Sequence, residues 1–286
     1  MANPPSSPEF DWKMYRYIPS LPAAILFLVL FTILTILHMH SYTQHRKTSI
    51  IYIILGGLCE IIGFAARIGS HFDDASWAPF IMQGTLLLIG PLFFAATVYM
   101  MLGRTIRLAD AASISRISPR WCTRIFVAAD ISTLIVQGLG ASLMGTMKLS
   151  LALAGEKVVI AGLALQVATF IVFLIVSVDF HFRMKHTSKS SHDTVHDAWR
   201  KMLHILYTLS ALILLRCVFR LIEYSMGNAA YLISHEWTLY VFDGVPMLAV
   251  LSLLFMWRPT EDHKHATRKA TESSDEETGV VGSQRV

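Results

Sequence analysis

Residues 203–224 read LHILYTLSALILLRCVFRLIEY, a run long enough to cross a lipid bilayer as one helix. Its second half nevertheless carries three ionisable side chains, Arg216, Arg220 and Glu223. They stand at positions i, i+4 and i+7 and therefore share one face of the helix. A charged side chain at mid-bilayer costs about 2.5–3.5 kcal/mol on insertion scales. All three therefore need partners or water inside the protein.

The rest of the chain has the composition of a helical membrane protein. Of its 286 residues, 54% are hydrophobic and only 15% are charged. Several runs of about 20 apolar residues are each long enough to span a bilayer. We predict an all-α polytopic membrane protein, a bundle of seven transmembrane helices. The predicted spans are residues 18–38, 49–69, 79–102, 123–147, 158–180, 203–225 and 237–257.

The predicted membrane domain, residues 18–258, leaves two short tails. Residues 1–17 are polar, contain three prolines and carry aromatic residues close to the first span. We predict an extracellular tail that ends in an interfacial anchor. Residues 259–286 are rich in charged and hydroxyl side chains, and we predict a disordered cytosolic tail.

Basic residues predict the orientation of the bundle. The loops after the first, third and fifth spans and the C-terminal tail together carry 17 lysines and arginines, whereas the other side carries four. The positive-inside rule then places the N-terminus outside and the C-terminus in the cytosol. We expect the basic loops to contact anionic lipid of the inner leaflet, and we expect no nucleic acid as a partner.

The second span carries charges that match those of the sixth. Glu60 and Arg67 stand seven residues apart, as do Arg216 and Glu223, but in the opposite order of charge. Both helices run from the cytosol outward, so a rise of about 1.5 Å per residue puts Glu60 level with Arg216, and Arg67 level with Glu223. If these helices are neighbours, two interhelical ion pairs are predicted.

Arg220 then requires a third acid. By depth that acid is Asp243 of the seventh span, with Gln83 of the third span at the same level. Three arginines against three acids form a neutral set, as a low-dielectric interior requires. Two interpretations stay open: ion pairs that only fix the register of the bundle, or a polar cavity that opens toward the outer leaflet.

Asp130 of the fourth span differs from these charges. It lies in the inner third of its span, with Gln137 on the same face and no arginine at its depth. An unpaired carboxyl there is expected to be largely protonated. It is either a proton site of a coupled transporter or a neutral hydrogen-bonding group. Gln166 of the fifth span is predicted to form an interhelical hydrogen bond.

Small residues and prolines predict features of helix packing. Gly138, Ala141, Ser142 and Gly145 bring small side chains together in the fourth span, which favours close helix contact. Pro91 and Pro246 interrupt the third and seventh spans. Each proline frees a backbone carbonyl that a neighbouring group or water must satisfy.

Motifs of other classes of membrane protein are missing. There is no GxxxxGK[ST] phosphate loop, so transport driven by ATP on this chain is not expected. His38, His40, His181 and His204 all stand near cytosolic ends of spans, which disfavours a buried zinc or haem site. The three cysteines make neither a disulfide framework nor a metal motif. We expect no metal, no cofactor and no enzymatic activity; a membrane hydrolase is the weakest hypothesis.

Together, these motifs resemble the fungal RTA-like, or lipid-translocating exporter, family of seven-span proteins. In the second to fifth spans the matching residues are the run 60–67 (EIIGFAAR), Gln83, Pro91, Ala95, Ala96, Tyr99, the run 102–104 (LGR), Asp130, Gln137, Gly138, Gly162 and Gln166. The most specific match is Arg216, Arg220, Glu223 and Gly227, followed by Glu236, Tyr240, Phe242 and Asp243. The resemblance covers residues 18–258.

The resemblance implies a role in moving or sensing amphipathic lipids and in resistance to membrane-active toxins. The first hypothesis is a lipid or amphiphile translocator in the plasma membrane, with its substrate at Glu60, Arg67, Gln83, Arg216, Arg220, Glu223, Glu236, Tyr240 and Asp243. Asp130 and Gln137 would serve as a proton site or continue the path inward. The alternative is a seven-helix receptor-like sensor or regulator of lipid asymmetry that signals to cytosolic partners.

Overall fold

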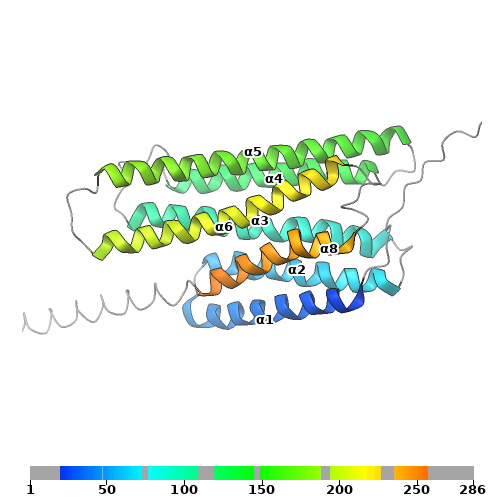
Figure 1. Cartoon of the computed structure of the whole chain (residues 1–286), viewed down its shortest axis with the longest axis horizontal. Helices are drawn as coiled ribbons and strands as arrows, with labels where there is room; N and C mark the ends of the chain where they lie inside the picture. Colours follow the sequence, from blue (N-terminus) through cyan, green and yellow to red (C-terminus); the bar gives the residue numbers. More distant parts are fainter. Residues whose placement is uncertain are drawn as a thin grey trace, which may run out of the picture.

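The computed structural model describes residues 20–46, 48–72, 77–108, 119–144, 149–187, 194–226 and 235–256. Within these ranges every regular element is helical, and seven helices are long and apolar enough to cross a membrane (Figure 1). The predicted seven-span helical bundle is therefore confirmed. The predicted tails, residues 1–17 and 259–286, lie outside the described residues.

The first six helices are longer than the predicted spans, and the seventh has the predicted length of 21 residues. The first six are α1 Leu21–His45, α2 Thr48–Phe72, α3 Trp77–Leu108, α4 Pro119–Met144, α5 Leu149–Thr187 and α6 Thr194–Ser225. The seventh span, Glu236–Met256, comprises α8 (Glu236–Leu239), the π-helical segment η2 (Tyr240–Gly244) and α-helical residues 245–256. At about 1.5 Å per residue, the 39 residues of α5 exceed the thickness of a bilayer core of about 30 Å.

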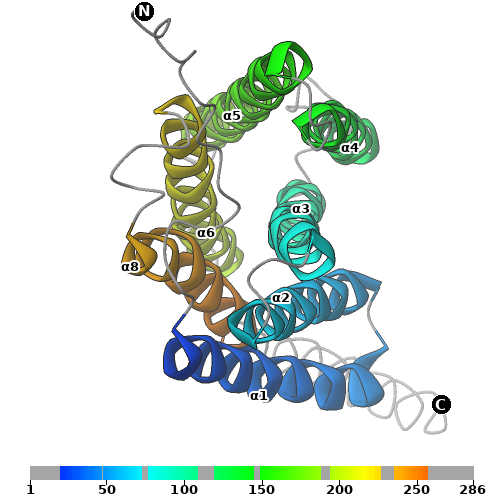
Figure 2. The same ribbon diagram turned by 90° about the vertical axis from the view of Figure 1, so that its right-hand side faces the viewer.

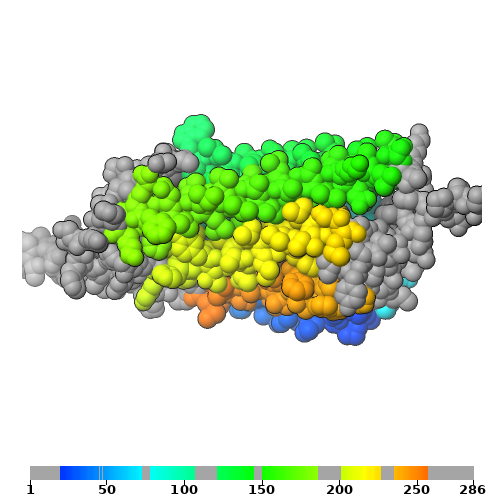
Figure 3. All heavy atoms as spheres, turned by 45° about the horizontal axis from the view of Figure 1, so that its top comes forward, coloured from blue at the N-terminus to red at the C-terminus, as the bar shows by residue number. Residues whose placement is uncertain are grey.

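The arrangement of the helices places α3 at the centre. Helix α3 packs against α2, α4 and α6, and it is the most buried of the seven spans. Viewed from one end, the chain runs from α1 and α2 through α3 to α4 and α5, then returns through α6 to α8 (Figure 2). On the side drawn in Figure 3, α5, α6 and the seventh span form adjacent bands. Each of these three helices has exposed apolar side chains, among them Ile175, Leu215 and Val245.

Aromatic rings fasten the seventh span to α1 and α2. Phe27 and Phe64 lie with ring centroids 5.4 Å apart, and Tyr240 lies 5.1 Å from Phe27. A Cβ atom on Gly244 would come within 2.6 Å of the Phe27 ring, so this glycine is needed for the close approach. These contacts hold the π-helical segment against the first two helices.

Helices α4 and α5 pack through glycines, but on a different face from the predicted one. A Cβ atom on Gly140 would lie 2.8 Å from the Gly155 carbonyl oxygen, and one on Gly162 would lie 2.7 Å from Gln137. The predicted small-residue interface is wrong, because Gly138 meets nothing within 4 Å and Ala141 and Ser142 are exposed. Gly145 lies outside the described residues. Small residues at four-residue spacing indicate a smooth helix face, but they do not indicate whether another helix or lipid covers that face.

Candidate functional site

Two arginines of α6 share one carboxylate of the seventh span. The Arg216 Nε atom lies 2.5 Å from Asp243 Oδ1, and Arg220 Nη2 lies 2.5 Å from Asp243 Oδ2. Arg220 also contacts Glu223 one turn along α6, with Nη1 3.0 Å from Oε2. All four side chains are buried. The predicted pair of Arg220 with Asp243 is confirmed, and α6 and the seventh span are joined by a continuous row of charges.

The backbone of the seventh span changes where Asp243 stands. In η2 the N–H of Val245 bonds the carbonyl of Tyr240, a five-residue rather than a four-residue step. Pro246 follows directly and has no N–H to donate, so the regular ladder is interrupted at this point. Such single π-turns occur frequently at functional sites in helices. Here the π-turn lies in the segment that carries both Tyr240 and Asp243.

Arg216 also satisfies a backbone group of α3. Pro91 cannot donate to the carbonyl four residues earlier, which is that of Leu87. Arg216 Nη2 donates to this Leu87 oxygen. The sequence predicted a free carbonyl at this level, and the structure supplies the donor. Arg216 therefore connects three helices, α6, the seventh span and α3. Gln83 is buried one turn before Leu87 on α3.

Glu60 lies at this cluster without an ion pair. It is 2% exposed, and Oε1 has no hydrogen-bond partner among the described residues. Its carboxyl lies against α3, since a Cβ atom on Gly90 would come within 2.7 Å of Oε1. Arg216, Arg220 and Asp243 are near enough to act on it electrostatically. We call Glu60, Arg216, Arg220, Glu223 and Asp243 the charge cluster.

Two of the predicted ion pairs are therefore wrong. Arg216 pairs with Asp243 rather than with Glu60, and Arg67 pairs with Glu236 rather than with Glu223. The reason is the position of α3, which packs against both α2 and α6. Equal depth is not enough for two side chains to meet when a third helix stands beside both. As a result the charge cluster holds three acids and two arginines instead of a neutral set.

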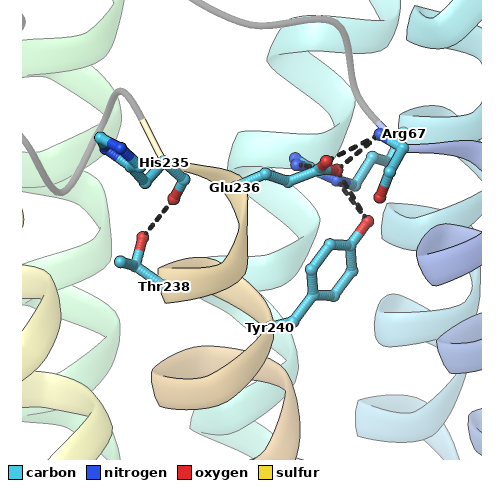
Figure 4. A network of polar contacts seen from close by, with 6 residues as sticks. Arg67, His235, Glu236, Thr238 and Tyr240 are labelled. Atoms are coloured by element: carbon cyan, nitrogen blue, oxygen red, sulfur yellow. Dashed lines mark hydrogen bonds and ion pairs between the residues drawn. The ribbon is translucent and has the colours of Figure 1, made fainter.

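Arg67 belongs to a second network at the predicted outer end of the bundle, shown in Figure 4. Its Nη2 atom lies 2.8 Å from Glu236 Oε1, and its Nε atom donates to the Tyr240 hydroxyl at 3.0 Å. That hydroxyl donates in turn to Glu236 Oε1, at 3.0 Å. The backbone N–H of Ser20 lies 2.8 Å from both Glu236 oxygens. We call Ser20, Arg67, Glu236 and Tyr240 the outer latch, because they join the starts of α1 and α8 to α2.

Asp130 lies apart from both networks, where α3, α4 and α5 meet. The Tyr99 hydroxyl of α3 donates to Asp130 Oδ2 at 2.7 Å. Two turns along α4, Gln137 Nε2 donates to Gln166 Oε1 of α5 at 2.9 Å, so the predicted interhelical bond of Gln166 is confirmed. Asp130, Gln137 and Gln166 are all buried.

Several contacts could not be read from residue types alone. Tyr99, Glu236 and Tyr240 entered only through the family resemblance, and Ser20 had no signal because it contributes a backbone N–H. Among the described residues, no group of three or more histidine, cysteine, aspartate or glutamate side chains could hold a metal ion. The three cysteines are free.

Comparison with known proteins places this chain in a family. A family model described as "RTA1 like protein" matches residues 53–264. Protein RTA1 of Saccharomyces cerevisiae is 34% identical over 271 residues, which cover 86% of this chain and 84% of that protein. Protoporphyrin uptake protein 1 of the same species is 31% identical, over 86% of this chain and 92% of its own.

A third relative carries the name of a lipid transporter. Sphingoid long-chain base transporter RSB1 of Saccharomyces cerevisiae is 28% identical over 275 residues, which cover 85% of this chain and 72% of that protein. No solved structure matches the chain. The names of two of these relatives describe uptake or transport, and none of the three names a catalytic activity. The seven-span helical bundle and the match over residues 53–264 agree, and the chain belongs to the RTA1-like family of multi-pass membrane proteins.

Proposed function

We propose that this protein moves lipids or other amphipathic molecules across the plasma membrane and so gives resistance to toxic membrane-active compounds. In this proposal the N-terminus is outside, and the substrate headgroup binds at the charge cluster. The names of the relatives support a substrate that is amphipathic and membrane-soluble. The observation that carries the proposal is the unequal number of acids and arginines in the cluster, where Glu60 forms no ion pair with any residue that the structure describes.

Charges that served only to fix the register of the helices would not require more acids than arginines. Ion pairs that only fix helix packing are most stable when each buried charge is matched, because an uncompensated buried charge is costly. Buried charge inside a membrane domain is by default a sign of a substrate or ion pathway. A headgroup with ammonium and phosphate groups would meet both carboxylates and guanidinium groups in this cluster.

Access to the cluster requires movement of helices. Glu60, Arg216 and Asp243 are 2–3% exposed, so a headgroup enters only when α2, α6 or the seventh span separate. The outer latch holds α2 and α8 together at the predicted outer end. We therefore assign it the role of an outer gate, which opens when Arg67 and Glu236 part.

Flux of fluorescent lipid or sphingoid-base analogues in proteoliposomes tests the proposal. Glu60→Gln and Asp243→Asn are expected to reduce flux strongly, because each changes the charge that meets the headgroup. Asp179→Asn is the matched control: it removes an acid whose pair with Arg183 is 34–46% exposed. Equal flux in native protein, Glu60→Gln and Asp243→Asn would refute the proposal. Ligand-dependent recruitment of a cytosolic protein without flux would favour the receptor-like alternative.

A further inference from the structure

The Asp130 carboxyl is buried in the membrane domain with one oxygen unused. It is 3% exposed and lies outside the charge cluster. Oδ2 accepts the Tyr99 hydroxyl at 2.7 Å, and Oδ1 has no hydrogen-bond partner among the described residues. The described residues contain no lysine, arginine or histidine that forms an ion pair with it. Asp130 therefore differs from Glu60, which lies in the combined field of Asp243 and two arginines.

The tyrosine that binds this carboxyl is packed among other aromatic rings. The Tyr99 ring lies 4.6 Å from Phe173 and 5.5 Å from Phe126, measured between centroids. Few groups that titrate face Asp130: Tyr99 from α3 and Cys217 from α6. The Thr169 hydroxyl of α5 also lies near the carboxyl, but it donates to the Gln166 carbonyl at 2.9 Å. A carboxylate in such surroundings, with no cation, takes up a proton rather than bear the full cost of burial.

A line of polar groups leads from Asp130 along the α4–α5 interface. Thr133 donates to the Asp130 carbonyl at 2.7 Å and is fully buried. Gln137 stands two turns from Asp130, and its Oε1 atom is a second buried acceptor without a partner in the described residues. These two unused acceptors lie about 10 Å apart along one buried helix face, and each calls for a partner such as water or a bound proton.

We propose that Asp130 is a proton-binding site that drives substrate movement with the proton gradient. A proton from water adds to Oδ1 and gives the neutral acid, and its release to water restores the carboxylate. Tyr99 keeps its own proton and donates to Oδ2 in both states. Coupling to substrate rests on the transport function proposed above. Helix α3 links the proton site to the charge cluster physically. It carries Tyr99, which binds Asp130, and the Leu87 carbonyl, which accepts a hydrogen bond from Arg216.

Infrared spectroscopy of the purified, reconstituted protein tests proton binding without any substrate. A protonated carboxylic acid absorbs at a C=O stretching frequency separate from that of a carboxylate. We expect a band that titrates with pH, is lost in Asp130→Asn and persists in Glu60→Gln. In Tyr99→Phe the band should move to higher frequency, because the hydrogen bond to Oδ2 is lost. Tyr99→Phe keeps the carboxyl and serves if Asp130→Asn does not fold. Identical spectra in native protein, Asp130→Asn and Tyr99→Phe would overturn the proposal.

Flux under an imposed pH gradient tests the coupling. One proton per substrate allows about a tenfold accumulation for each pH unit. We expect this accumulation in native protein and its loss in Asp130→Asn, with downhill flux retained. Gradient-driven accumulation that survives in Asp130→Asn would overturn the coupling. Flux unaffected by Glu60→Gln would contradict the proposed substrate site instead, so the two failures are distinguishable.

Discussion

Asp243 accepts both arginines of α6, so single residues of the charge cluster differ widely in their expected effect on stability. Asp243→Asn leaves Arg216 without its acid and Arg220 with Glu223 alone, and breaking a buried pair costs about 3–5 kcal/mol. Glu60→Gln removes a charge that has no ion pair and should leave stability unchanged or raised. Thermal unfolding in detergent measures both variants. A loss of stability for Glu60→Gln as large as for Asp243→Asn would contradict this prediction.

The outer latch can be tested with a variant of Tyr240 that keeps the aromatic ring. Tyr240→Phe retains the contacts with Phe27 and Phe64 but removes the hydroxyl between Arg67 and Glu236. We expect a loss of about 1–3 kcal/mol, because a buried charged donor loses its acceptor. Hydrogen exchange at the first turn of α8 should also rise. Unchanged exchange there would show that the hydroxyl does not hold the latch.

At the scale of helices, two glycines of α4 form a matched pair. Gly140→Ala would place a Cβ atom 2.8 Å from the backbone of α5, which cannot move aside cheaply, and overpacking costs about 1–3 kcal/mol. Gly138→Ala meets open space and should gain up to about 1 kcal/mol from the helix propensity of alanine. Unfolding midpoints of the two variants should therefore shift in opposite directions. Equal shifts would place the α4–α5 contact elsewhere.

For the helices, some contacts could be predicted from the sequence and others could not. Hydropathy predicted seven helices because a helix that crosses a bilayer needs about 20 predominantly apolar residues. Charges at matching depth predicted that Arg220 meets Asp243. The partners of Glu60, Arg67 and Arg216 were predicted wrongly, since depth along a helix is encoded in residue spacing whereas the identity of neighbouring helices is not. The Leu87 carbonyl was predictable from Pro91, but its donor was not.

At the scale of the whole molecule, the orientation remains a prediction from the basic loops. In a cysteine-free background, Met226→Cys and Arg46→Cys place exposed thiols at opposite ends of the bundle. An impermeant maleimide should label Met226→Cys in intact cells and Arg46→Cys only after permeabilisation. Permeabilisation also serves as the control for expression. The reverse pattern would place the N-terminus in the cytosol.

The sharing of Asp243 by Arg216 and Arg220 also bears on biosynthesis. The ribosome completes α6 before it makes residue 243, so for some time Arg220 has only Glu223 as a bonded acid and Arg216 lacks the acid it pairs with in the finished protein. During that interval the outer half of α6 carries two arginines and one acid, and an unpaired charge in lipid is costly. A chain that stops between α6 and the last span would keep this surplus positive charge permanently and would be a target for quality-control proteolysis.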